Sequence, residues 1–220
     1  MRGLLLGMTE PLPEHEEEFN AWYDTEHIPE RLSVPGFVSA RRWDADEPCD
    51  LALPREKRLG RYLVTYELER PEVLETPEYL KHVGAGATPW TRRCLERAAV
   101  FRRWACEQVN PGSLFPPTES RALLLACGDV PSQNEAEFNR WYDEEHIPLL
   151  RKVDGVLAAR RFRARSGTPR YIALYDLADE LVPESPGWRA ALETPWAQRI
   201  EALTEGSEWI IKVYLAYAPA

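Results

Sequence analysis

The sequence contains few cysteines, and none of them belongs to a paired motif. Cys49, Cys94, Cys106 and Cys127 form no CxxC pair and show no metal-ligand spacing. Small proteins that depend on disulfides carry several cysteines at short, regular spacings, so we expect no disulfide framework. Too few candidate ligands converge in the sequence to hold a metal ion, and we expect no metal site.

Long apolar runs are also missing. The longest ones span only a few residues, as in LLL at 4–6 and LLLA at 123–126. A transmembrane helix needs about 20 predominantly apolar residues, so no membrane span is expected. The apolar run that follows Arg2 is likewise too short for the core of a signal peptide. We therefore expect a cytoplasmic protein without a membrane partner.

Neither half of the chain carries an excess of positive charge. The net charge is −9: residues 1–113 hold 15 Lys and Arg against 20 Asp and Glu, and residues 114–220 hold 12 against 16. Binding to nucleic acid needs a basic surface, so nucleic acid is set aside as a partner. Hydrophobic residues are abundant, at 44%, and include eight Trp, nine Tyr and six Phe. This composition supports sizeable cores, in one domain or in two of about 100 residues each.

A repeat that runs through the whole chain decides between these two options. The segment EFNAWYDTEHIP at 18–29 returns as EFNRWYDEEHIP at 137–148, and 14 of 25 residues are identical between 19–43 and 138–162 without a gap. The match extends upstream, where RGLLLGM resembles RALLLAC, and downstream, where RYLVTYEL resembles RYIALYDL and TPWTRR resembles TPWAQR. The sequence therefore predicts two domains, at 1–109 and 121–220, joined by the Pro- and Gly-containing linker at 110–120.

The repeated segment predicts a helix that a proline ends. Phe19, Trp22, Tyr23 and Ile28 follow helical spacing, and a short β-like run precedes them. Pro29 disfavours helical geometry at the residue before it, so we expect the helix to break there.

Strand patterns follow this helix in each half. The stretch at 36–43 alternates like a strand, which would place Phe37, Ser39, Arg41 and Trp43 on one face. A second strand at 61–68, a helix at about 77–98 and a final strand complete the order β-α-β-β-α-β. We expect an α+β protein of two ferredoxin-like repeats. Packing the two sheets face to face would bury both bare faces in an intramolecular pseudo-dimer, and exposed strand edges leave a further homodimer open.

The pattern FNxWYDxEHIP, followed by VxG, ARR and a helix that begins with TPW, resembles the dimeric α/β-barrel superfamily. Within it, the chain is most similar to EthD-like proteins, whose first helix ends in a similar E-H-x-P, here as a tandem fusion. The resemblance implies a ligand cavity between the sheet and the helices of each half, with the histidine of the first helix near its mouth. The superfamily includes cofactor-free monooxygenases, cyclases, dehydratases, isomerases and haem enzymes, so the resemblance does not select a reaction.

The histidine of the repeated segment is the first candidate for catalysis. Tyr23, Asp24 and His27 are three and four residues apart, so these groups can meet on one surface of a helix. An imidazole with a carboxylate in reach is the unit of general acid/base catalysis. The helix C-terminus and Asp24 both favour the charged imidazolium. We assign catalytic roles to His27, Asp24 and Tyr23, and to their counterparts His146, Asp143 and Tyr142.

Other polar and aromatic residues are candidates for binding the substrate. Adjacent residues on a strand point to opposite faces, so one arginine of each Arg-Arg pair faces the helices, where it could bind a carboxylate or an enolate. A histidine in the Gly-containing loop at 81–90 could cover a pocket. The candidates are Asn20, Asn139, Arg41, Arg160, Trp90, Trp196 and His82.

A structural interpretation competes with the catalytic one. The histidine and the aspartate could satisfy carbonyl groups where the helix ends, and Glu26 and Glu145 could pair with the strand arginines. On this interpretation the repeated segment is a folding signature, and the protein binds a small molecule without catalysis or is purely structural. Duplication of a catalytic segment also argues against two working sites, because fused enzymes often keep one.

The leading hypothesis is a cofactor-independent enzyme that acts on a small apolar or aromatic molecule. No nucleophile, zinc-protease or nucleotide-binding motif is present, and His82 is the one candidate for a haem ligand in the second helical region. Dehydration, isomerisation, cyclisation or a related lyase step would need only proton transfer. Oxygenation without a cofactor is a special case of the same chemistry.

Overall fold

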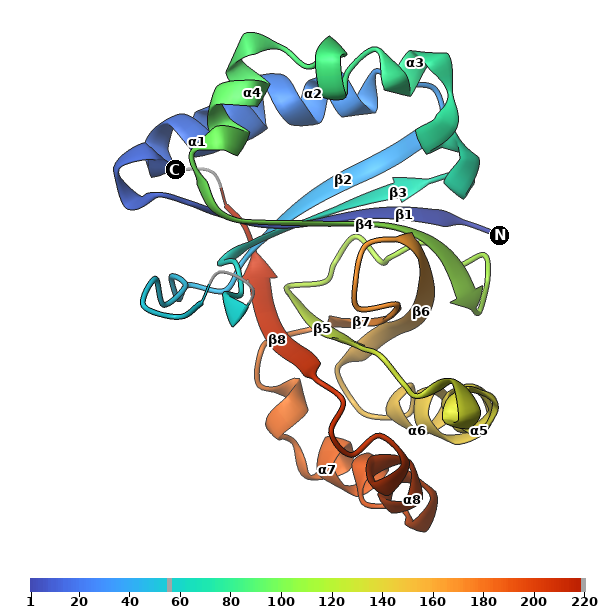
Figure 1. The fold of residues 1–220 in the computed structure, drawn as a ribbon. Helices are drawn as coiled ribbons and strands as arrows, with labels where there is room; N and C mark the ends of the chain where they lie inside the picture. Colours follow the sequence, from blue (N-terminus) through green and yellow to red (C-terminus); the bar gives the residue numbers. More distant parts are fainter. Residues whose placement is uncertain (55–56, 219–220) are drawn as a thin grey trace. The chain divides into compact units, whose positions relative to one another are not determined.

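The computed structural model describes residues 1–54 and 57–218, which form two compact units (Figure 1). Of the described residues, the first unit comprises 1–54, 57–107, 165–167 and 217–218, and the second comprises 108–164 and 168–216. Each unit contains a four-stranded antiparallel sheet with helices, so the protein belongs to the α+β class. The division expected at 1–109, 110–120 and 121–220 stays a prediction.

The first unit has the element order β-α-β-β-α-β. Its sheet has the strand order β4-β1-β3-β2, and all neighbouring strands are antiparallel. Figure 1 shows its helices on one face of that sheet. The elements are β1 (Gly3–Pro11), α1 (Glu16–Trp22), the π-helical turn η2 (Tyr23–His27), α2 (Ile28–Leu32), β2 (Phe37–Asp44), β3 (Tyr62–Leu68), α3 (Pro77–Leu80), α4 (Pro89–Glu96) and β4 (Ala98–Asn110).

The second unit repeats this order. Its strand order is β8-β5-β7-β6, again antiparallel throughout. The elements are β5 (Ala122–Gly128), α5 (Glu135–Trp141), the π-helical turn η7 (Tyr142–His146), α6 (Ile147–Leu150), β6 (Val156–Ser166), β7 (Tyr171–Leu177), α7 (Pro186–Leu192), α8 (Pro195–Leu203) and β8 (Trp209–Ala216).

The helix of the repeated segment does not break at the proline, which corrects the sequence prediction. It widens into a π turn, in which the amide of Ile28 donates to the carbonyl of Tyr23, and α2 then continues with Pro29 in its first turn. Pro29 has no amide hydrogen to donate, and it lies at the first turn of the α-helical segment that follows the π turn, where proline is tolerated best. Single π turns occur frequently at functional sites, and both histidines of the repeat close such a turn.

A bulge in β2 changes which side chains share a face. The register against β3 shifts between Phe37 and Ser39. Because side chains alternate along a strand, one extra residue reverses the faces of all the residues beyond it. Phe37 therefore packs in the helix-side core, whereas the indole of Trp43 donates to Thr65. The expected shared face of Phe37 and Trp43 was wrong for this reason.

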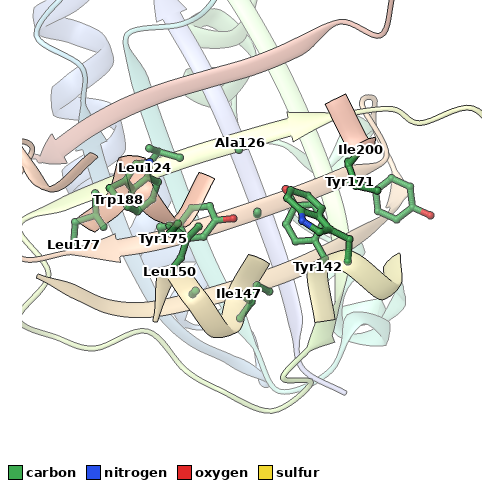
Figure 2. Close-up of a cluster of buried hydrophobic side chains, with 14 of the residues drawn as sticks. Leu124, Ala126, Tyr142, Ile147, Leu150, Tyr171, Tyr175, Leu177, Trp188 and Ile200 are labelled. Carbon is green, nitrogen blue, oxygen red and sulfur yellow. The ribbon is translucent and has the colours of Figure 1, made fainter. Parts of the chain in front are cut away.

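Each unit has its own core, built from aromatic side chains of the repeated segment against aliphatic and aromatic residues of the sheet. Figure 2 shows this arrangement for the second unit, with Tyr142, Ile147 and Leu150 from the helical segment near Leu124 and Tyr175 of the strands. Phe, Trp and Tyr recur at equal positions of the repeated segment, which explains why the same packing forms twice.

One half-buried glutamate joins the helices within each unit. Glu26 accepts from the hydroxyl of Thr88 at 2.6 Å, and Glu145 accepts from the hydroxyl of Thr194 at 2.5 Å. Each threonine is also an N-cap, because it accepts from the backbone amide three residues later. The expected pairing of these glutamates with the strand arginines was therefore wrong, since the glutamates lie against the second helical region.

We expect Thr88→Val and Thr194→Val each to destabilise its unit by about 1–2 kcal/mol, because each change removes a cap and a partner of a carboxylate. Urea unfolding of the two variants beside the parent measures this. Thr118→Val is the matched control, since this hydroxyl is exposed and contacts only Glu119. An equal loss of unfolding free energy in Thr118→Val would show that the N-cap threonines have no specific role.

Candidate functional site

The first unit contains a cavity of about 450 Å³ between its sheet and its helices. Its wall includes Trp22, Tyr23 and His27 of the repeated segment, and Tyr66 of β3. The second unit contains a cavity of about 410 Å³ at the corresponding place, with Trp141, Tyr142, His146 and Tyr175 in its wall. Both volumes lie within the range of small-molecule sites. The repeat therefore places one histidine and two tyrosines in each cavity.

His27 lies in an aromatic box. Its ring packs on Trp22 with 4.4 Å between centroids and meets the edge of Tyr23 at 5.2 Å. Its Nδ1 is buried, and no described residue forms a hydrogen bond with it. Burial, and next the positive charge of Arg31, lowers the pKa of His27 to about 3. The imidazole is therefore neutral at neutral pH, which corrects the expectation of an imidazolium.

His146 repeats this geometry in the second unit. Its ring packs on Trp141 at 4.2 Å, and the edge of Tyr142 lies at 4.8 Å. Its Nδ1 is also buried without a hydrogen-bond partner among the described residues. Burial, and next the charge of Arg161, lowers the pKa of His146 to about 3. Both imidazoles are thus neutral at neutral pH, although the positive charge that lowers their pKa comes from Arg31 in one unit and from Arg161 in the other.

Neither aspartate orients its histidine. Asp24 forms a salt bridge with Arg42 at 2.7 Å, and Asp143 accepts from the amide of Asn110 at 2.7 Å. The π turn offers a physical reason, because it changes the angular spacing on which the expected contact between Asp24 and His27 depends. The expected role of both aspartates as orienting groups is corrected accordingly.

The arginine that faces the helices is the second of each pair. Arg42 donates to Asn20, and Arg161 donates to Asn139 at 2.6 Å. The two asparagines therefore hold these arginines and do not line the cavities. The guanidinium groups lie over the rings of Tyr23 and Tyr142, at 4.8 Å and 4.2 Å.

Arg41 and Arg160 lie on the opposite face of their strands from the helices, which corrects their assignment as substrate-binding residues. Arg41 stacks over Trp43 at 4.3 Å, and Arg160 forms a buried salt bridge with Asp176 at 3.2 Å. Alternation alone could not decide between the two arginines, because the bulge in each strand sets the phase.

The tyrosines of the cavities are hydrogen-bond donors. Burial raises the pKa of Tyr23 to about 12 and raises the pKa of Tyr142. Burial also raises the pKa of Tyr66 and Tyr175 well above the ordinary value. All four phenols therefore keep their protons at neutral pH, and the hydroxyl of Tyr66 is buried without a hydrogen-bond partner among the described residues.

Sequence reasoning missed Tyr66 and Tyr175, although a signal was present. The matching strands RYLVTYEL and RYIALYDL both carry this tyrosine, and alternation places it on the same face as Tyr62 or Tyr171. Tyr62 and Tyr171 belong to the helix-side cores of their units. A repeated aromatic residue on the helix-facing side of a strand thus points to the cavity wall.

The remaining candidates divide between the cavity and its surroundings. His82 lines the first cavity, and its Nδ1 lies 2.8 Å from Glu30. Trp90 packs against the core of its unit, and the indole of Trp196 donates to Glu137 at 2.9 Å. Neither tryptophan lines a cavity.

Residues 1–54 and 57–218 contain neither a metal-ligand cluster nor a membrane-spanning helix. No group of three or more His, Cys, Asp or Glu side chains in this range could hold a metal ion. No helix in the same range is long and apolar enough to cross a membrane.

No family model and no curated protein matches the sequence. Solved structures do match the fold. An anthrone oxidase-like protein is 14% identical with a TM-score of 0.66, and the alignment covers 99% of this chain and 91% of that one. A chlorite dismutase variant from Candidatus Nitrospira defluvii is 8% identical with a TM-score of 0.59, covering 99% and 91%. A monooxygenase-like protein from Listeria innocua is 8% identical with a TM-score of 0.51, covering 100% and 96%.

The likeness to these structures shows that this chain shares their fold. The identities are too low to carry an activity from one protein to another. The comparisons thus establish the fold of this chain, and its function depends on the chemistry of the two cavities.

Proposed function

We propose that the chain is a cofactor-independent enzyme that removes a proton from a small aromatic substrate. The observation that carries this proposal is the pairing, in one aromatic cavity, of a neutral imidazole with a protonated phenol. His27 Nδ1 and the hydroxyl of Tyr66 are both buried without hydrogen-bond partners among the described residues. Unpaired buried polar groups are costly, and a bound substrate would supply both partners.

The chemistry follows from the protonation states. A neutral His27 can accept a proton from an acidic C–H or O–H group of the substrate. Tyr66 can donate a hydrogen bond to the substrate oxygen on which negative charge develops, and Tyr23 lies within the same cavity. Dehydration, isomerisation, cyclisation and cofactor-free oxygenation all begin with such a proton removal.

A pKa of about 3 makes His27 a weak base in the empty cavity. The developing oxyanion changes this, because a negative charge beside an imidazolium raises its pKa. Proton transfer would therefore depend on the substrate anion being formed next to the ring. His146 with Tyr142 and Tyr175 has the same groups, so the proposal extends to the second cavity.

The proposal also includes the arrangement of the chain. The two units would be ferredoxin-like repeats of EthD type, fused in tandem and paired sheet to sheet as an intramolecular dimeric barrel. The repeated element order and the repeated side-chain contacts support this origin. The tryptophan and tyrosine side chains in the walls of both cavities support an aromatic substrate.

Anthrone is a suitable probe, because its C10 protons are acidic and its enolate is aromatic. We expect the protein to speed deuterium exchange at C10 in D₂O under nitrogen, measured by NMR. His27→Phe keeps the ring stack but removes the base, and Tyr66→Phe removes the donor. If the first cavity works, each change is expected to slow exchange by about 100-fold. His146→Phe and Tyr175→Phe are the matched changes for the second cavity.

The same assay separates the reaction classes. Oxygen uptake in air, with anthraquinone and water as products, would indicate cofactor-free oxygenation, and exchange without uptake would indicate lyase or isomerase chemistry. A visible absorption band of the purified protein would contradict independence from a cofactor.

A specific observation favours one alternative. Two imidazoles that are both uncharged and stacked on tryptophan also suit a non-catalytic binding protein. Quenching of tryptophan fluorescence by anthrone, with exchange no faster than in buffer, would support this alternative and overturn the enzyme proposal.

A further inference from the structure

The two cavities differ in charge, although one histidine and two tyrosines occupy matching positions in both walls. The wall of the first cavity includes two guanidinium groups, those of Arg31 and Arg103, and no carboxylate. The wall of the second cavity includes one carboxylate, that of Glu201, and no Lys or Arg. The residues that bring the positive charge have apolar counterparts in the second half.

The first of these counterparts follows from the repeat. In the ungapped alignment, Arg31 corresponds to Leu150, and its neighbour Glu30 corresponds to Leu149. The second follows from the strand registers. Ala105 lies opposite Leu5 in the first unit, and Val213 lies opposite Leu124 in the second.

This register makes Ile211 the counterpart of Arg103. Both arginines of the first cavity are thus replaced by aliphatic residues in the second, so the loss of charge there is not compensated at either position.

Arg31 is an unusual residue for a cavity wall, because it is only 3% exposed. Its Nη2 donates to the carbonyl of His82 at 2.9 Å. Its Nη1 lies 3.4 Å from Glu30 but forms no hydrogen bond with a described residue. Glu30 is also engaged by His82 at 2.8 Å, so this carboxylate is shared between two groups.

Arg103 gives the first cavity an excess of positive charge. Its Nη2 donates to the hydroxyl of Tyr79 at 3.0 Å, and no carboxylate of the described residues forms an ion pair with it. A guanidinium group binds a carboxylate with two parallel hydrogen bonds and keeps its charge at any ordinary pH. The wall therefore offers an anion two guanidinium groups within a cavity that is otherwise lined mainly by aromatic and aliphatic side chains.

We propose that the first cavity binds a small aromatic substrate that carries one carboxylate, held by Arg31 and Arg103, and that the second cavity prefers uncharged aromatic molecules. This inference rests on the proposed function, since it names the substrate class for the same cavity. The duplicated site would thus have diverged in specificity while keeping its base and its phenols.

The bound anion would also affect His27. After burial, the charge of Arg31 is the cause that lowers the pKa of His27. A carboxylate on Arg31 offsets that charge and makes the imidazole a stronger base. The substrate would thereby activate the base only when it is in place.

The test compares two ligands of equal shape, 2-naphthoate and the uncharged 2-naphthamide, by isothermal titration calorimetry. We expect naphthoate to bind at one site per chain, and Arg31→Leu to weaken its binding at least 10-fold while changing naphthamide binding less than about 2-fold. Lys81→Met is the control, because it removes an exposed positive charge from the same unit.

Thermal melts establish that the variants fold. If Arg31→Leu does not fold, Arg103→Ile makes the same comparison at a half-buried strand position, with the residue that the second half carries there. Equal affinity of the parent for both ligands would overturn the inference. An equal loss of naphthoate binding in Lys81→Met would do so too, because it would indicate general charge attraction.

The outcome is separable from that of the proposed function. Naphthoate has no acidic C–H group, so the titrations report on binding alone. Charge-selective binding without any exchange of anthrone would support a binding protein with an anion site. Exchange of anthrone without charge selectivity would leave the enzyme proposal standing and remove the anion site.

Discussion

Replacing Asp176 by alanine is expected to destabilise the second unit by about 3–5 kcal/mol. Asp176 and Arg160 are 0% and 1% exposed, and they form a salt bridge at 3.2 Å. Removing one partner of such a pair takes a counter-ion away from a charge that stays buried, which costs far more than the pair itself contributes. Urea unfolding at pH 7 measures the change.

Two further variants make this prediction specific. Asp154→Ala removes an exposed carboxylate from the same unit and is expected to change stability by less than about 0.5 kcal/mol. The double variant Arg160→Met with Asp176→Leu removes both charges at similar volume, and it is expected to recover most of the lost stability. A single variant that loses less than 1 kcal/mol, or a double variant that loses more than Asp176→Ala, would contradict this account.

Stability is expected to fall on acidification by about 2 kcal/mol for each repeat histidine between pH 7 and pH 5. His27 and His146 have a pKa of about 3 when folded and an ordinary value of 6.5 when unfolded. Below pH 6.5 the unfolded state binds a proton that the folded state does not bind, so acid favours unfolding. The contribution of each neutral histidine to stability is complete above pH 6.5 and is lost as the pH falls toward the folded-state pKa of about 3.

Urea unfolding at pH 7 and pH 5 tests this for the parent, for His27→Phe and for His146→Phe. Each variant keeps a ring on its tryptophan and is expected to show about 2 kcal/mol less pH dependence than the parent. The two changes should add in the double variant, because each histidine lies in its own unit. Carboxylates titrate mainly below this pH range, so they contribute little to the difference. An unchanged slope in both variants would mean that the rings are protonated in the folded protein.

The sequence alone determined the repeat and the order of strands and helical regions. The single helix expected at about 77–98 was wrong, because this region forms two helices, Pro77–Leu80 and Pro89–Glu96. The matched segments around Phe19 and Phe138 required two copies of one β-α-β-β-α-β order, because equal patterns of apolar residues bury equal faces. Helical spacing also put His27 and Tyr23 within reach of one another, as it did their counterparts, whereas the cavity beside them was implied by the family resemblance. These features depend on local spacing, which is written directly in the residue order.

Only the tertiary structure decided which groups meet and what charge they carry. The bulge in β2 set Arg42, rather than Arg41, against the helices, and the π turn carried the helix past Pro29. Burial in the aromatic box made His27 neutral, against the expectation from its neighbours in sequence. The alignment shows Leu150 at the position of Arg31, but only the structure shows that Arg31 lies in a cavity wall. Strand register, the hydrogen-bond pattern of the helical turn and the desolvation of buried groups arise from packing between distant segments, and no local pattern encodes them.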